Sequence, residues 1–146
     1  MEISVKTFDE LSNTELYQLL RLRSEIFVVE QDCVYLDLDN KDQKALHIFG
    51  TKNNVVVAYT RVFKPGDYFK NASIGRVVVA QDQRKFGYGK IIMQASIAAV
   101  EERFPNTSIE ISAQSYLLKF YSDLGFVAFG EEYLEDGIPH TRMLKK

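Results

Sequence analysis

The spacing of apolar residues in the first part of the chain predicts a strand followed by a helix. In EISVKT (residues 2–7), Ile3 and Val5 alternate with polar neighbours, as in a half-buried strand. The segment SNTE fits a capping box, in which Ser12 accepts a hydrogen bond from the Glu15 amide, so a helix is expected to begin here. Apolar residues at helical spacing extend this helix to about residue 30: Leu16, Leu19, Leu20, Ile26 and Phe27.

Strands are predicted to dominate the middle of the chain, after a polar and turn-rich loop at residues 32–45. The apolar runs 46–51 and 55–63 flank the turn residues KNN, which is a hairpin signal. A second turn, KPGDYFKN, leads to an apolar strand at residues 73–80. A helix ending near Phe104–Pro105 follows, and its predicted buried stripe consists of Ile91, Ile92, Ala95 and Ala99.

The last part of the chain predicts a strand at 108–113, a short helix and two further strands. Gly125 is expected to end the short helix in a left-handed conformation, and strands at 126–134 and 140–146 flank the turn EDGIP. The short helix carries one apolar face: Leu117, Phe120, Tyr121 and Leu124. The order of elements predicts an α/β (α+β) fold, with a mixed central sheet and flanking helices in a single domain covering residues 1–146.

Composition and charge narrow the classes of function. Of 146 residues, 46% are hydrophobic and 26% are charged, as in an ordinary globular protein. The net charge of −2 gives no overall attraction to nucleic acid or to an anionic membrane, so neither is expected as a partner. Cys33 is the only cysteine, which excludes an intrachain disulfide. Because there is no signal-peptide pattern and no apolar run long enough to span a bilayer, the expected location is the cytoplasm.

The segment QRKFGYGK (residues 83–90) has two glycines where a helix should begin. Glycine in a helical turn costs about 0.5–1 kcal/mol relative to alanine. At a strand-to-helix junction, however, glycines let a phosphate approach the free amides of the first helical turn, where the helix dipole is positive. Arg84, Lys85 and Lys90 add positive charge nearby. The segment therefore predicts a diphosphate site, although a tight turn with glycines for packing would give the same pattern.

Three sets of motifs give this segment a family context. The pattern Arg84-x-x-Gly87-x-Gly89 is not a P-loop, and Ile92 stands at the third glycine position of a dinucleotide fingerprint. It resembles the coenzyme A loop of the GNAT superfamily of N-acetyltransferases. FYSDLGF (120–126) resembles the fourth-helix signature of that superfamily, and FVVEQD, IGRVVV and EDGIPH resemble its ElaA-like branch. The resemblance covers the whole chain and implies a GNAT-like acyl-CoA acyltransferase fold, with acetyl-CoA as cosubstrate and no metal.

The resemblance also implies where the acyl donor binds. The backbone of one strand would pair with the pantetheine arm, and the glycine segment would receive the pyrophosphate. Gln114 stands where many relatives carry an asparagine that contacts the cofactor. The cofactor-binding residues implied in this way are Val77, Val78, Val79, Arg84, Lys85, Phe86, Gly87, Tyr88, Gly89, Lys90 and Gln114. A buried strand is expected for the valines in either case, and Lys85 is equally compatible with a solvated turn.

The implied reaction is direct attack of an amine on the thioester in a ternary complex. Tyr121 matches the tyrosine that protonates the departing thiolate in many family members, although its apolar stripe also fits a core aromatic. No motif identifies the general base. Glu30, at the end of the first helix, and His47 are the first candidates, and His140 and Glu110 are weaker ones.

The predicted function is acyl transfer from acetyl-CoA to an amine on a small molecule or a peptide. Cys33 is not expected to carry the acetyl group, because nothing in the sequence activates its thiol and direct transfer needs no covalent intermediate. The alternative is a non-catalytic acyl-CoA-binding or interaction module on the same fold. A homodimer through YLEDGIP (residues 133–139) is compatible with the sequence, which specifies neither the acceptor nor the oligomeric state.

Overall fold

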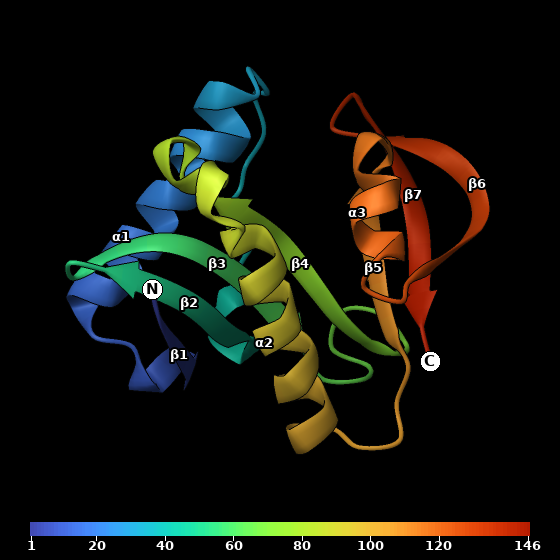
Figure 1. Cartoon of the computed structure of the whole chain (residues 1–146), viewed down its shortest axis with the longest axis horizontal. Coiled ribbons are helices and arrows are strands. Elements are labelled where there is room, and N and C mark those ends of the chain that lie inside the picture. Colours follow the sequence, from blue (N-terminus) through green and yellow to red (C-terminus); the bar gives the residue numbers. More distant parts are fainter.

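A seven-stranded mixed sheet forms the centre of the computed structural model, which describes all residues 1–146 (Figure 1). Its strands are β1 (Glu2–Thr7), β2 (Leu46–Lys52), β3 (Val55–Phe63), β4 (Ala72–Val79), β5 (Ile109–Gln114), β6 (Val127–Glu135) and β7 (Ile138–Lys145). Their order across the sheet is β1-β2-β3-β4-β5-β7-β6. The helices are α1 (Asn13–Arg23), α2 (Tyr88–Arg103) and α3 (Leu118–Ser122). The predicted fold class is confirmed, and every predicted strand is present.

The capping box that starts α1 is confirmed. The Glu15 amide donates to the Ser12 hydroxyl at 3.0 Å, and the Ser12 amide donates to the Glu15 carboxylate at 2.8 Å. The predicted helix to residue 30 is also present, but it changes character. After Arg23 the chain continues as a π-helical segment, Ser24–Glu30, which carries Glu30 to the end of β4, where it contacts Arg84. The expected loop at 32–45 follows, with one 3-10 turn at Asp42–Lys44.

The buried stripe of α2 differs from the prediction at one position. Ile91 is 42% exposed, so its assignment to the core was wrong, whereas Ile92 and Ala99 are buried as predicted. The remaining buried positions follow the helical period from Ile92: Met93, Ser96, Ile97 and Val100. The polar Ser96 concealed this phase in the sequence. It is fully buried because its hydroxyl bonds to the Ile92 carbonyl at 2.7 Å and to the hydroxyl of Thr60.

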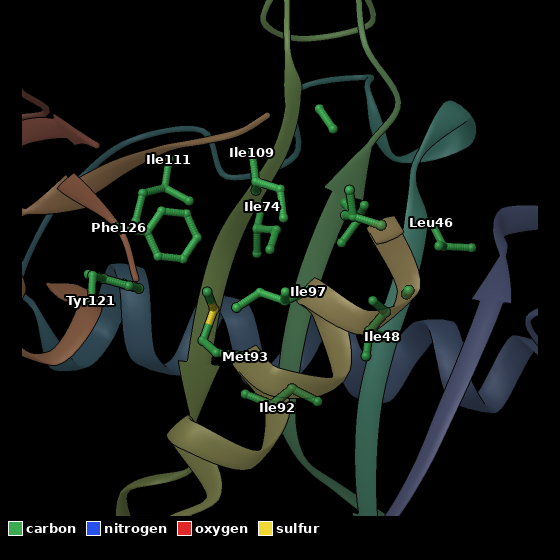
Figure 2. Packing of buried hydrophobic residues seen from close by; sticks show 14 of the residues in the cluster. Leu46, Ile48, Ile74, Ile92, Met93, Ile97, Ile109, Ile111, Tyr121 and Phe126 are labelled. Atoms are coloured by element: carbon green, nitrogen blue, oxygen red, sulfur yellow. The ribbon is translucent and has the colours of Figure 1, made fainter. Parts of the chain in front are cut away.

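The helices cover the two faces of the sheet unequally. On one face, a cluster of 19 buried residues lies between the sheet and the helices α2 and α3. It includes Ile92, Met93, Tyr121 and Phe126 (Figure 2). A smaller cluster of seven buried residues lies under α1 on the other face, over β2, β3 and β4. On this face α1 packs against β3 and β4.

The strands β4 and β5 run parallel but pair only at one end. The paired residues are Ala72 with Ile109 and Ser73 with Glu110, and beyond them the two strands separate. Figure 1 shows β4 and β5 close together at one end and far apart at the other. The connection between them runs through α2, so the open end lies beside the first turn of this helix. All other neighbouring strands are antiparallel.

Buried ion pairs attach the loop at 32–45 to the sheet. Arg23 of α1 contacts the carboxylates of Asp37 at 2.9 Å and Asp42 at 2.8 Å. Arg61 of β3 also contacts Asp42, at 3.0 Å, and Asp39 at 2.8 Å. Both guanidinium groups are almost entirely buried. The sequence indicated a polar, turn-rich loop here, and the structure shows that its aspartates are the partners of these buried arginines.

The ion pairs keep the aspartates ionised. Burial alone would raise the pKa of Asp42, but the hydrogen bonds and charges of Arg23 and Arg61 outweigh burial and hold that pKa below its usual value. The same balance of burial against Arg61 lowers the pKa of Asp39 to about 2. Since an unfolded aspartate has a pKa of about 3.9, these pairs contribute their full stability above about pH 4. That contribution is lost as the pH falls towards 2.

Removing the shared carboxylate should therefore destabilise the protein strongly. We expect Asp42→Asn to lower the free energy of unfolding by about 3–5 kcal/mol, because two buried guanidinium groups lose a charged partner. Urea denaturation at pH 7 measures this change. The control is Asp123→Asn, which removes the exposed pair with Lys119 and should leave the midpoint within error. Equal effects of the two substitutions would contradict the role given to the buried network.

Candidate active site

The separated ends of β4 and β5 form the wall of a cleft with a volume of about 610 Å³. Its lining comes from both faces of the sheet. Gly87, Gly89 and Tyr121 belong to the side covered by α2 and α3, whereas Glu30 and Tyr35 come from the π-helical segment and the loop on the opposite side. The cleft therefore passes through the sheet, and two molecules entering from opposite faces could meet in it.

The backbone of β4 is available for binding along this cleft. No residue of β5 pairs with β4 beyond Ser73, so the polar groups that residues 74–79 direct towards β5 lack a strand partner. The strand is also irregular, since Arg76 has a φ of 49° and the register with β3 shifts next to it. Val77, Val78 and Val79 line the cleft, as the resemblance implied. Such a strand edge can pair with the amides of an extended ligand.

The glycine segment is built differently from the direct strand-to-helix turn that we expected. A 3-10 turn, Gln81–Phe86, separates β4 from α2, and Gly87 then adopts a left-handed conformation with a φ of 72° as the N-cap. No side chain caps the amides of the first turn. A Cβ at Gly89 would meet Phe120 at 3.6 Å and Val79 at 3.9 Å. The amides and the helix dipole therefore form an anion site at the mouth of the cleft.

The structure divides the predicted residues of this segment into two groups. Arg84, Gly87, Gly89 and Lys90 line the cleft. The side chains of the other three lie outside this lining: Lys85, Phe86 and Tyr88. A contact of their backbone amides with the diphosphate stays a prediction. The Phe86 ring is exposed beneath the Lys52 ammonium at 4.2 Å, and the Lys85 ammonium lies 5.3 Å from the same ring. Tyr88 packs into the main core, as a residue on the inner face of α2 must.

Glu30 reaches the cleft as expected, but its carboxylate is engaged. Its two oxygens contact the Arg84 guanidinium at 2.8 Å and 3.0 Å, a two-point geometry that a phosphate group would also satisfy. The Arg84 Nε atom donates to the Val79 carbonyl at 3.2 Å, which ties this side chain to the end of β4. In this state Glu30 is the partner of Arg84 and not a free proton acceptor.

The prediction that His47 acts near the acetyl group was wrong. His47 lies in β2, fully buried and outside the cleft. Its Nε2 atom donates to the Asp42 carbonyl at 2.9 Å, because a carbonyl can only accept, and its Nδ1 atom accepts from the Tyr59 hydroxyl at 2.6 Å. Burial lowers the pKa of His47. Strand alternation directs this side chain towards the α1 face and the buried arginines, so it is a core histidine.

Tyr121 belongs both to the core and to the cleft. Its ring makes edge contacts with Phe120 and Phe126, with ring centres 5.0 Å and 6.2 Å away. The residue nevertheless lines the cleft, and burial raises the pKa of its phenol, which therefore stays protonated at neutral pH. Gln114 lies at the end of β5, and its amide contacts the amide of Gln31 at 3.4 Å from the other side of the cleft. Gln31 lies within the FVVEQD motif, but the sequence assigned no role to it.

The remaining candidates from the sequence have separate places. Glu110 is buried in an ion pair with Arg142 at 2.6 Å and does not line the cleft. Cys33 lines the cleft, but its thiol donates to the Asp136 carbonyl at 3.3 Å and has no base beside it. His140 of β7 lines the cleft. No cluster of side chains suited to a metal ion is present, and no helix is both long and apolar enough to cross a lipid bilayer.

Comparison with known proteins agrees with this geometry. A family model described as acetyltransferase (GNAT) domain matches residues 12–146. The protein ElaA of Escherichia coli is 40% identical over 139 residues, which are 94% of this chain and 91% of ElaA. Its crystal structure superposes with a TM-score of 0.94 over 100% of both chains. A crystal structure of an acyl-CoA N-acyltransferase from Pseudomonas aeruginosa matches over 100% of both chains, with a TM-score of 0.95 and 36% identity.

A more distant relative extends the same assignment. A putative acetyltransferase of Bacillus subtilis is 32% identical and covers 92% of each chain. The family match spans the cleft, the glycine segment and the helix that carries Tyr121. The chain therefore belongs to the GNAT acetyltransferase family, and within it the chain is similar to ElaA over nearly its whole length.

Proposed function

We propose that this protein transfers an acetyl group from acetyl-CoA to an amine, by direct attack within a ternary complex. One observation carries this proposal: the unpaired backbone of β4 leads along a cleft to the uncapped N-terminus of α2. The pantetheine arm of acetyl-CoA carries amides that can pair with this strand edge, and it ends in a diphosphate that can bind at the helix N-terminus. The family match and the acyl-CoA N-acyltransferase of Pseudomonas aeruginosa support acyl-CoA as the donor.

The donor would be held mainly by the backbone. The strand edge at 77–79 would pair with the pantetheine amides, and the first-turn amides of Gly89 and Lys90 would bind the diphosphate. Arg84 would leave Glu30 to bind a phosphate oxygen, because its guanidinium offers the same two donors to either anion. Gln114 would contact the donor near the thioester from the end of β5.

The reaction needs few groups once the two substrates are aligned. Attack of a neutral amine on the thioester carbon forms a C–N bond and breaks the C–S bond, and holding both partners in place supplies much of the rate. The Tyr121 hydroxyl makes no hydrogen bond to another protein group and is free to donate to the departing sulfur. The raised pKa of this phenol keeps its proton in place until negative charge develops on that sulfur.

The diphosphate assignment can be tested by removing the charge of Arg84. We expect Arg84→Gln to weaken coenzyme A binding about tenfold, because one charge-assisted contact is lost. Binding of pantetheine, which has no diphosphate, should not change. Isothermal titration calorimetry measures both ligands, and Lys119→Gln on the exposed surface of α3 is the control. Equal loss for coenzyme A and pantetheine would exclude a contact between Arg84 and the diphosphate.

The role of Tyr121 can be tested by removing its hydroxyl alone. Tyr121→Phe should lower kcat about 100-fold while coenzyme A binding is retained, because proton donation is lost and the ring still packs. Thiol release from acetyl-CoA measures turnover with a panel of butylamine, 1,4-diaminobutane and an amidated dialanine peptide. His47→Gln should lose stability but keep its kcat. Unchanged turnover in Tyr121→Phe would rule out this tyrosine as the acid.

A further inference from the structure

His140 is a titratable group in the cleft that the proposed roles above do not use. It lies in β7, next to Gln114 of β5 and Tyr133 of β6 in the sheet register. Its Nδ1 atom is 2.7 Å from the carbonyl oxygen of Ile138. Since a carbonyl oxygen only accepts, Nδ1 must carry a proton. When the imidazole is neutral, its free lone pair is therefore on Nε2.

The Nε2 atom of His140 faces the carboxylate of Glu135 at 3.4 Å. Glu135 also accepts from the Ser112 hydroxyl at 3.3 Å, and that hydroxyl in turn bonds the hydroxyl of Tyr133. No lysine or arginine contacts Glu135, and its side chain is 46% exposed. The Nε2 atom of His140 and the Glu135 carboxylate thus lie side by side. Both line the end of the cleft at which the turn between β6 and β7 lies.

Glu30 and the arginines in and beside the cleft already have partners. Glu30 is paired with Arg84. Arg76 contacts Asp37 at 2.8 Å, and Arg142, beside the cleft on β7, is paired with Glu110. The remaining titratable residues that share this lining are Cys33, Tyr35, Lys90, Tyr116, Tyr121 and Asp136. Asp136 precedes the turn glycine and has no ion pair, so it adds to the negative charge beside Glu135.

We propose that Glu135 and His140 form the acceptor subsite, and that its substrate is a positively charged primary amine without a neighbouring carboxylate. This inference rests on the proposed acetyl transfer. An ammonium group would bind between the Glu135 carboxylate and Nε2 of His140, both of which accept protons. An acceptor with a carboxylate next to its amine would find no unpaired arginine at this end of the cleft.

The proton balance follows from these positions. The ammonium gives one proton to Nε2 of His140, and the resulting imidazolium is stabilised by Glu135 and later releases that proton to water. The neutral amine attacks the thioester carbon, the C–N bond forms and the C–S bond breaks. The nitrogen loses its second proton to water, and Tyr121, after giving its proton to the departing sulfur, regains one from water. The products are an amide, a free thiol and one proton.

Matched substitutions in the β6–β7 hairpin separate binding of the ammonium by Glu135 from proton transfer to His140. Glu135→Gln should raise KM for 1,4-diaminobutane about tenfold, because an ammonium–carboxylate contact is lost. The ratio of kcat/KM for 1,4-diaminobutane to kcat/KM for 2-aminobutyrate, which carries a carboxylate beside its amine, should also fall. His140→Asn preserves a donor to the Ile138 carbonyl but removes Nε2, so kcat should fall about 100-fold while KM for the amine changes little. Glu132→Gln, on the same strand and outside the cleft, is the control.

Thiol release measures turnover, and calorimetry with coenzyme A measures the donor site in each variant. Wild-type turnover of the cationic amines, with the two specific losses above, supports the subsite. The subsite is overturned if Glu135→Gln and His140→Asn behave as Glu132→Gln does. It is also overturned if the wild-type protein binds coenzyme A but acetylates neither butylamine nor 1,4-diaminobutane. Failure to bind coenzyme A would instead overturn the proposed transferase function, and thermal unfolding identifies a variant that merely fails to fold.

Discussion

The early separation of two parallel strands is the constraint on which the rest of the structure depends. β4 and β5 are joined by only two residue pairs, so most of the inner edge of β4 has no strand partner. Unpaired backbone groups inside a protein cost free energy unless water or a ligand satisfies them. The crossover through α2 brings the open amides of a helix N-terminus to the same end. A peptide-like ligand with a terminal diphosphate satisfies both sets of groups at once.

Ionic contacts hold the walls of this opening, and they differ in burial. The pairs of Arg23 and Arg61 with the aspartates of the 32–45 loop are sealed under α1, where the low dielectric makes breaking one partner costly. The pair of Glu30 with Arg84 is half-exposed at the cleft and can be exchanged for another anion. Glu135 has no lysine or arginine partner. The buried ion pairs thus fix the structure behind the cleft, whereas the charged groups inside the cleft can bind a ligand.

Local patterns predicted the elements well, because each depends on neighbours in sequence. Ser12 and Glu15 satisfy one another's hydrogen bonds, and Gly125 ends its helix with a φ of 98°.

Sequence patterns failed where a partner that is distant in the sequence determines whether a residue is buried. Ser96 is buried with its hydroxyl bonded to the Ile92 carbonyl and to Thr60 of another element, and this polar residue in the buried stripe led to the wrong placement of Ile91. Asp37 and Asp42 looked like loop residues because their arginines lie on other elements. His47 has a strand neighbour, Tyr59, that no periodicity reveals. The glycine segment and Tyr121 were found through a family resemblance, whereas Gln31 and the tautomer of His140 required the structure.

A crystal structure of the protein with coenzyme A tests the central claim most directly. The account predicts the pantetheine arm between β4 and β5, and diphosphate oxygens within hydrogen-bonding distance of the Gly89 and Lys90 amides. Arg84 should have left the carboxylate of Glu30. Coenzyme A bound on another surface, with the space between the strands still open and Arg84 still paired to Glu30, would contradict it.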